Sequence, residues 1–234
     1  MNLRILGIDT SSLACSAAVT ENGKLLGEKI MNSGLTHSET LMPAVEAILD
    51  GMNLTPADID LFAVAAGPGS FTGVRIGVCA VKALCAGTDK PCARVDTLHA
   101  LAMGSGFDGL ICPILDARRE QVYTALFRGN GESAERVMED KAIPLTELIA
   151  SLPNEKVYFT GDGLDTYEDA IREKMGDRVV IAPGHMRALR ASCVCRAAEL
   201  CGDTHMSGME LTPLYLRLSQ AERERSERLT RAKL

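Results

Sequence analysis

The sequence predicts an α/β protein of two lobes, each built on a mixed β-sheet with helices packed on it. Residues 3–95 alternate segments of strand and helix character in the order β-β-β-α-β-α-β, which is typical of a mixed sheet with helices. A second alternation of strands and helices follows residue 103. The chain has 234 residues, 46% of them hydrophobic and 24% charged, so it is long enough for two lobes with cores of their own.

The first lobe is predicted over residues 1–102. Its strands and helices follow from hydrophobic periodicity, and the Asn22-Gly23 pair marks the hairpin between the second and third strands. The predicted strands are Leu3–Asp9, Cys15–Thr20, Lys24–Ile30, Leu61–Ala66 and one that ends near Val95, and the predicted helices are Thr36–Gly51 and Phe71–Ala86.

The second lobe is predicted over residues 103–216, with residues 103–109 as the joint between the lobes. Its predicted strands are Leu110–Asp116, Gln121–Phe127, Lys156–Thr160 and Arg178–Ile181, and its predicted helices are Leu145–Ser151, Asp165–Met175 and Arg190–Cys201. Residues 217–234 form a charged tail, for which an exposed helix and a disordered segment both remain open.

Composition argues against several classes of function. The net charge is −6, Trp is absent and aromatic residues make up 4%, so the chain is poorly equipped to hold a phosphate backbone or stack bases alone. The eight cysteines form no zinc-binding pattern, which favours small buried side chains in a reducing compartment. There is no apolar run of about 18 residues and no signal-peptide pattern. We therefore expect a cytoplasmic protein without membrane contact.

The first motif is Asp9-Thr10-Ser11-Ser12, at the end of the first predicted strand. A strand-end carboxylate beside hydroxyls and backbone amides suits phosphate and a hydrated Mg²⁺ ion, because Mg²⁺ prefers one or two carboxylates together with water. The plainer interpretation is a hairpin turn whose hydroxyls satisfy its own amides. Spacing alone favours the plainer one.

The second motif is a glycine-rich turn that opens a helix, Gly67-Pro68-Gly69-Ser70-Phe71-Thr72-Gly73. No Lys-Ser/Thr follows it as in a P-loop. Gly69, Gly73 and Gly77 recur every four residues and Ala80 continues the series, which places a stripe without side chains on one helix face. Because each interior glycine costs about 1 kcal/mol relative to alanine, another backbone must approach this face closely. That backbone lies in the same chain or in another one.

Two further segments concentrate polar groups. The first is Thr36-His37-Ser38-Glu39, in which the His and Glu do not face each other on a helix and so make a poor metal-binding pair. A hydroxyl that caps the start of the helix is the plainer interpretation. The segment Asp116-Ala117-Arg118-Arg119 reads as a turn between strands with surface ion pairs, and we expect Asp116 and Arg118 to have a structural or inter-lobe role.

Taken in order, these segments resemble the bacterial TsaB (YeaZ-like) family. The resemblance rests on Ile8-Asp9-Thr10-Ser11, His37-Ser38-Glu39, Gly67–Gly77, Asp116-Ala117-Arg118-Arg119 and Tyr215-Leu216-Arg217. It covers most of the chain and is strongest over residues 5–123. It implies a two-lobed fold of the actin-like ATPase and sugar-kinase type.

The resemblance also implies a function. The chain would be a non-catalytic accessory subunit that supports a catalytic subunit of the TsaD type. That subunit forms N6-threonylcarbamoyladenosine on tRNA, at the adenosine next to the anticodon of tRNAs that read ANN codons. A small ATPase subunit of the TsaE type joins the assembly, and tRNA would be reached through the complex. ATP and metal would be used by the partner subunits, and Asp9, Thr10 and Ser11 would retain only a weak contact with ATP or ADP.

The chain departs from the family's enzyme where that enzyme binds metal. TsaD-type enzymes use a segment of the form Val-Asn-His-Leu-Glu-Gly-His, and the matching segment here is Val95–Leu101. Thr97 and Leu101 replace both histidines, and His99 stands at the position of the Glu. We therefore expect no metal ligands, no catalytic residues, and a packed or exposed His99.

The docking surface is expected on the helices Thr36–Gly51 and Ser70–Ala86, with the glycine stripe allowing close approach. The expected interface residues are His37, Leu41, Val45, Gly69, Phe71, Gly73, Ile76, Gly77 and Ala80. Two alternatives remain: a homodimer through the same face when the partner is absent, and a stand-alone kinase or metallopeptidase of the same fold. The replaced histidines argue against a peptidase, and no residue can be named as the base of a kinase.

Overall fold

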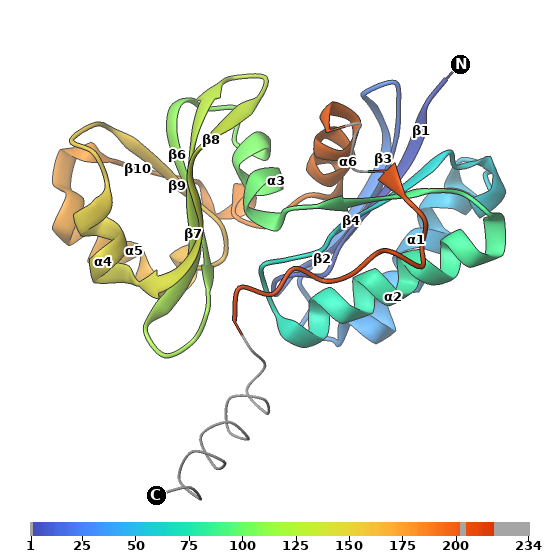
Figure 1. Cartoon of the computed structure of the whole chain (residues 1–234), viewed down its shortest axis with the longest axis horizontal. Coiled ribbons are helices and arrows are strands. Elements are labelled where there is room, and N and C mark those ends of the chain that lie inside the picture. The colour runs from blue at the N-terminus through green and yellow to red at the C-terminus, as the bar shows by residue number, and fades with distance from the viewer. Residues whose placement is uncertain (1, 202–204, 218–234) are drawn as a thin grey trace, which may run out of the picture.

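A computed structural model describes residues 2–201 and 205–217, which form two lobes joined side by side (Figure 1). Each lobe contains one β-sheet, of six strands in the first lobe and five in the second. The architecture is therefore the two-lobed α/β fold that the sequence predicts.

The sheet of the first lobe has the strand order β11-β5-β4-β1-β2-β3. Strands β1, β2 and β3 form an antiparallel meander. Strand β4 pairs in parallel with β1, and β5 pairs in parallel with β4. Asn22 and Gly23 both have positive φ, as the tight turn between β2 and β3 requires. The strands are β1 (Arg4–Asp9), β2 (Cys15–Glu21), β3 (Lys24–Met31), β4 (Leu61–Ala65), β5 (Cys92–Val95) and β11 (His205–Met206).

Helices cover both faces of this sheet. Helices α1 (His37–Gly51) and α2 (Phe71–Thr88) pack on one face, where Leu6 and Ile8 of β1 point into their core. Helices α3 (Thr97–Gly104) and α6 (Ala191–Leu200) occupy the other side, and Ile5 belongs to their core. Successive residues of β1 thus enter opposite cores, as the alternation of side chains along a strand requires.

The sheet of the second lobe has the order β10-β9-β6-β7-β8, which repeats β5-β4-β1-β2-β3 of the first. The strand directions repeat as well, because β6, β7 and β8 are antiparallel and β9 and β10 add in parallel. The elements are β6 (Asp108–Asp116), β7 (Gln121–Asn130), β8 (Ala134–Pro144), α4 (Leu145–Ser151), β9 (Val157–Thr160), α5 (Leu164–Met175) and β10 (Val179–Ile181). The expectation of two related lobes is confirmed.

Three elements were not predicted: α3, β8 and β11. Strand β8 alternates buried or half-buried positions with exposed ones and carries many charges, so its apolar signal is weak. Helix α3 has its apolar residues on most sides because it lies between α6 and the second sheet, so it lacks an amphipathic period.

The expected lobe boundaries need one correction. After residue 190 the chain returns to the first lobe, where α6 packs on β1 and β2 and Ser192 donates its backbone N–H to Glu28 Oε1 (2.9 Å). The range 103–216 therefore does not form the second lobe alone, because α6 and the segment that follows it belong to the first sheet.

The last described segment, residues 205–217, is named here the C-terminal strap. It starts with β11 at the edge of the first sheet and runs along α2 towards the second lobe (Figure 1). Lys82 Nζ on α2 donates to the Leu211 carbonyl (3.0 Å), and Leu214 N donates to the Ala66 carbonyl (2.7 Å). Arg217 then reaches the Ala117 carbonyl of the second lobe (3.1 Å), so the strap spans both lobes.

Candidate functional site

A largely buried polar loop follows β1 in the first lobe. Asp9 ends β1 and is fully buried. Its Oδ1 atom accepts hydrogen bonds from the backbone N–H (2.9 Å) and the hydroxyl (2.6 Å) of Ser11, whereas its Oδ2 atom has no partner. Burial raises the pKa of Asp9 to about 7, and the two bonds from Ser11 oppose this shift only in part.

The glycine stripe of α2 packs against this same loop. A Cβ atom at Gly73 would lie 2.0 Å from the Thr10 carbonyl oxygen, and one at Gly69 would lie 2.3 Å from the Ser11 carbonyl oxygen. A Cβ atom at Gly77 would lie 2.5 Å from the hydroxyl oxygen of Thr10. The close-packed backbone that the stripe predicts is therefore in the same chain. Gly69, Gly73 and Gly77 were expected at the partner interface, and that expectation is wrong.

The hydroxyls of the loop are used within the protein. Thr10 Oγ1 donates to the Gly73 carbonyl (2.8 Å), and Ser11 Oγ donates to Asp9. Asp9, Thr10 and Ser11 are all buried. In this arrangement neither hydroxyl is offered to solvent, so a phosphate could reach the three residues only if the loop rearranged.

The second lobe contributes a carboxyl group that the sequence analysis did not identify. Asp162 follows β9 and is partly exposed. Its Oδ1 atom is buried without a partner, and burial raises the pKa of Asp162 to about 6. The signal was present in Gly161-Asp162-Gly163, a strand-end Asp between glycines, but the motif is too short to stand out.

Asp116 ends β6, and Arg118 lies in the turn that follows it. Asp116 Oδ1 accepts the backbone N–H of Arg118 (2.8 Å) and the hydroxyl of Tyr167 (3.4 Å). The ion pair of Arg118 with Asp116 spans 3.4 Å, and the Arg118 side chain is 80% exposed. The adjacent carbonyl of Ala117 binds Arg217 of the strap. Asp116 thus stabilises the turn after β6 through the Arg118 amide, whereas the contact between the strap and the second lobe is made by the neighbouring Ala117 carbonyl.

Other expected interface residues divide between the core and the surface. Leu41 and Val45 are each 1% exposed and belong to the core of the first lobe, so they cannot contact a partner, and their assignment is wrong. His37 is half-buried and its Nε2 atom contacts the Ser12 carbonyl (2.8 Å). Ile76 and Ala80 are partly exposed on α2.

Phe71 is also partly exposed, and it starts α2 beneath the strap. Its ring stacks on Tyr215 at 5.0 Å between centroids, and the Arg75 guanidinium lies 3.7 Å from its centroid. Arg75 Nε also donates to the Tyr215 hydroxyl (2.7 Å). The start of α2 is thus joined to the strap by an aromatic and cationic stack.

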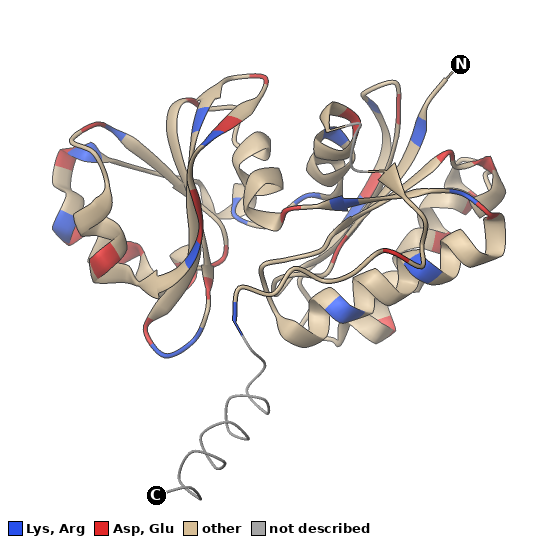
Figure 2. Ribbon diagram, viewed as in Figure 1, with Lys and Arg blue, Asp and Glu red and all other residues tan. Residues whose placement is uncertain are grey.

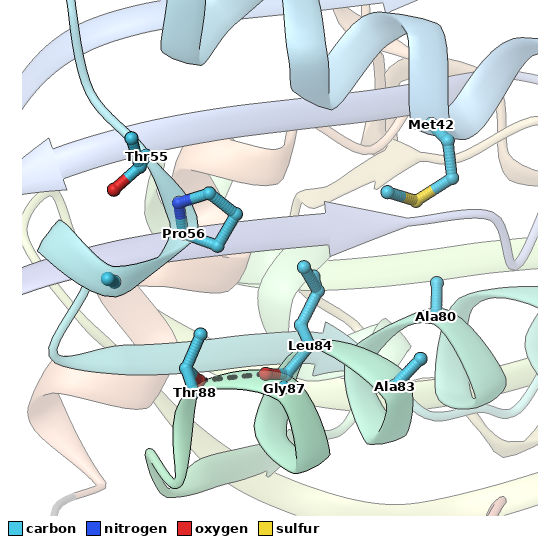
Figure 3. Close-up of a pocket in the computed structure, with 9 residues that line it drawn as sticks. Met42, Thr55, Pro56, Ala80, Ala83, Leu84, Gly87 and Thr88 are labelled. Carbon is cyan, nitrogen blue, oxygen red and sulfur yellow. Dashed lines mark hydrogen bonds between the residues drawn. The ribbon is translucent and has the colours of Figure 1, made fainter.

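The outer faces of α1 and α2 enclose a shallow apolar groove (Figure 3). Its cavity has a volume of about 570 Å³. The side chains that line it are mostly small and apolar, and none is charged. They are Met42, Thr55, Pro56, Ala57, Ala80, Ala83, Leu84, Gly87 and Thr88.

Helix α2 carries two charged residues, Arg75 and Lys82, which appear blue in Figure 2. Both contact the strap rather than the groove. By length and composition α2 is also apolar enough to cross a membrane, which the sequence analysis overlooked. Its buried side chains, among them Val74, Val78 and Val81, belong to the core of the first lobe, as expected for the core helix of an α/β lobe.

The segment that replaces the metal-binding motif forms α3. Thr97 and Leu101 are buried in the protein, and His99 Nε2 contacts the Ala134 carbonyl (2.9 Å). The His99 ring stacks on Phe127, with 5.4 Å between centroids. Burial lowers the pKa of His99. Of the two expected outcomes, packed or exposed, His99 is therefore the packed one.

The duplicated sheet order, the two crossover helices of the first lobe and the strand-end Asp9 define the class of this protein. It is a two-lobed α/β protein in which both lobes are built on the same sheet order. The structure of YeaZ from Pseudomonas aeruginosa shares the fold with a TM-score of 0.78, at 24% identity, over 92% of this chain and 100% of that one.

Sequence comparisons define the family more closely. The family model "TsaD: tRNA N6-adenosine threonylcarbamoyltransferase" matches residues 31–224. The "tRNA threonylcarbamoyladenosine biosynthesis protein TsaB" of Bacillus subtilis is 35% identical over 94% of this chain and 96% of its own length. TsaB of Escherichia coli is 31% identical over 82% of this chain and 86% of its own length. The chain belongs to the TsaB family.

Proposed function

We propose that this chain is a non-catalytic subunit that docks onto a catalytic subunit of the TsaD type and supports synthesis of threonylcarbamoyladenosine on tRNA. The pathway is the one in the printed names of its relatives. The catalytic partner is proposed because the TsaD family model matches this chain, so a partner of that family would share its fold.

The groove between α1 and α2 is the observation that carries this proposal. It is apolar, uncharged and exposed, and apolar grooves of this kind mark binding sites for proteins. Small residues such as Ala80 and Ala83 let a partner helix approach the backbone closely, while Met42 and Leu84 supply apolar contact area. The docking face is therefore the outer side of the two helices rather than the glycine stripe.

The catalytic chemistry is assigned to the partner. Thr97 and Leu101 stand where a TsaD-type enzyme has its metal-binding histidines, and both are buried in the core. Any contact of ATP or ADP with Asp9, Thr10 and Ser11 would be weak, because the hydroxyls are already bonded within the chain. Purified protein should therefore turn over ATP no faster than buffer. Turnover by this chain alone would contradict the proposed division of labour.

The rest of the assembly follows from the family. A TsaE-type ATPase joins the complex, tRNA is bound by the complex as a whole, and the site of action is the cytoplasm. In the absence of the catalytic subunit, the same apolar groove supports a homodimer.

An arginine introduced into the groove tests the docking face. Ala83 is exposed on α2, so Ala83→Arg should leave the fold intact. It should weaken co-elution with the TsaD-type subunit at least tenfold, because a charge would be buried without a partner. Thr146→Arg is the matched control, since Thr146 is exposed on α4 in the other lobe. Wild-type co-elution by Ala83→Arg would refute docking through this groove.

A further inference from the structure

The turn between β6 and β7 has an unusual backbone for the residues it contains. Arg118, Arg119 and Glu120 all have positive φ, of 64°, 54° and 59°. This left-handed conformation is unfavourable for residues with a side chain, and turns that require it usually contain glycine or asparagine. The backbone N–H of Gln121 closes the turn by donating to the Arg118 carbonyl (3.2 Å). Turn geometry therefore does not account for the two arginines, and their side chains are the feature to explain.

Both arginines of this turn are open to solvent. The Arg118 side chain is 80% exposed, and its ion pair with Asp116 spans 3.4 Å. Exposed pairs of this kind contribute little to stability, so Arg118 can exchange Asp116 for another anion at small cost. Arg119 is also exposed, and it forms no ion pair with another described residue. The tip of the turn is accordingly blue in Figure 2.

The end of the strap brings a third arginine to the same turn. Arg217 Nη1 donates to the carbonyl of Ala117, the residue directly before Arg118 (3.1 Å). Two residues before Arg217, the Tyr215 hydroxyl accepts a hydrogen bond from Nε of Arg75 (2.7 Å), which is exposed on α2. The strap therefore links basic groups of both lobes. We name these four residues the arginine patch: Arg75, Arg118, Arg119 and Arg217.

Arginines without an acidic partner are concentrated in the arginine patch. The chain is acidic overall, with 31 Asp and Glu residues against 25 Lys and Arg residues, so a basic surface is locally unusual. Among the described residues, five arginines take part in no ion pair: Arg75, Arg94, Arg119, Arg178 and Arg217. Three of the five belong to the patch. The acids of the turn itself, Asp116 and Glu120, offset only part of its positive charge.

Two of the arginines are held in position and still have donors to offer. The Arg75 guanidinium lies 3.7 Å from the centroid of the Phe71 ring, and only its Nε atom is bonded to Tyr215. Arg217 uses its Nη1 atom to contact Ala117. Because a guanidinium has five N–H donors, both groups can bind a further acceptor. A side chain that is already fixed loses less conformational entropy when it does so.

We propose that the arginine patch binds the phosphate backbone of RNA. A guanidinium group matches phosphate oxygens with two parallel hydrogen bonds. The four groups are exposed or half-exposed and come from a turn, the strap and a helix, an arrangement that suits an extended polyanion. The inference rests on the proposed function, in which tRNA is bound by the complex, and it names the surface of this chain that the tRNA contacts.

Titration of tRNA into the complex of the full chain with the TsaD-type subunit tests the patch. The double variant Arg118→Gln/Arg119→Gln should bind tRNA more weakly than the wild type. The slope of log affinity against log salt concentration should become flatter by roughly 1 to 2, since each lost phosphate contact changes it by roughly 1. Both side chains are exposed, so circular dichroism should show an unchanged fold.

The matched control removes two positive charges from another part of the same lobe. Arg128 and Lys156 are both exposed, and Arg128 is paired with Glu155, the residue before Lys156. Arg128 lies seven residues along β7 from Gln121, which is roughly 24 Å in an extended strand. Arg128→Gln/Lys156→Gln should therefore keep the affinity and the salt slope of the wild type.

Substitutions at Arg119 alone give a second readout. Arg119→Glu should weaken tRNA binding more than Arg119→Gln does, because it places a negative charge beside the phosphates. Arg119→Lys should keep the salt slope of the wild type, because the charge is retained. A purely structural role of Arg119 in the turn would not order the three variants by charge.

Co-elution with the TsaD-type subunit separates this inference from the proposed function. If the double variant co-elutes normally and binds tRNA with the affinity and slope of the wild type, the patch does not bind RNA and the proposed function stands. Loss of co-elution by the double variant would assign the patch to a protein partner and would also overturn RNA binding. If the wild type itself does not co-elute, the proposed function fails, and the same salt slopes measured on the chain alone decide the role of the patch.

Discussion

Gly73 shows at the scale of one residue how α2 is packed against the loop that follows β1. Its missing side chain allows the Thr10 carbonyl to lie where a Cβ atom would be, and its own carbonyl accepts the Thr10 hydroxyl. Gly73→Ala should therefore lower the free energy of unfolding by about 2 kcal/mol, through overpacking against backbone that cannot change rotamer. Urea denaturation followed by circular dichroism measures this change.

Gly87 on the same helix provides the control for Gly73. A Cβ atom at Gly87 would meet no atom within 4 Å, and the residue is exposed. Gly87→Ala should raise the free energy of unfolding by about 0.5–1 kcal/mol, because alanine favours the helix. If both variants unfolded at the same urea concentration, the contact between the stripe and the loop would not be a tight one.

At the scale of elements, α3 and β8 are joined by one arginine. The Nη2 atom of Arg136, on β8, lies 2.9 Å from Oδ2 of Asp96, the residue that caps the start of α3. Arg136 also forms an ion pair with Asp140 on its own strand. All three side chains are less than one-third exposed. Arg136→Ala should lower the free energy of unfolding by about 2 kcal/mol near neutral pH, since it leaves two carboxylates close together without their cation.

The decrease in the free energy of unfolding caused by Arg136→Ala should also depend on pH. Burial, and then the neighbouring Asp96, raise the pKa of Asp140 to about 7. The carboxyl group can take up a proton at lower pH, so the effect of Arg136→Ala should be smaller at about pH 5 than at about pH 8. Arg128→Ala is the control: its ion pair with Glu155 is 53% exposed on both sides and should contribute less than about 1 kcal/mol.

At the scale of the whole molecule, the strap closes the structure by crossing both lobes. Leu211 is fully buried against α2, and Arg217 ends on the Ala117 carbonyl of the second lobe. A chain ended after Met206 should melt at least several degrees below the wild type, because an apolar contact and the inter-lobe bond are lost. A chain ended after Ser219 keeps all of these contacts and should melt like the wild type.

The chain ended after Ser219 also tests the charged tail. The tail lies outside the described residues apart from Arg217, and its six basic groups against three acidic ones suggest an added contact with tRNA in the assembled complex. If so, its removal should lower tRNA affinity and flatten the dependence on salt concentration. Unchanged affinity and slope would leave the tail without a role in tRNA binding.

Local sequence signals predicted most of the fold. Alternating apolar segments and the Asn22-Gly23 turn identified the first sheet, and the strand-end Asp9 with Thr10 and Ser11 identified the polar loop after β1. Strand β8 escaped detection because charged residues stand at both its exposed and its half-buried positions, and α3 because it is surrounded by protein. Asp162 escaped detection because the motif Gly161-Asp162-Gly163 is too short to stand out.

The sequence by itself determined the class of fold, the family, and the presence of a helix face that must meet another backbone. Each of these depends on periodicity or on motifs within a few residues of one another. Only the tertiary structure decided where the helix face points and which of the expected interface residues are exposed. The glycine stripe illustrates the physical reason. Absence of a side chain demands a close contact, but the identity of the atom in contact with Gly73 depends on how β1 and α2 pack together.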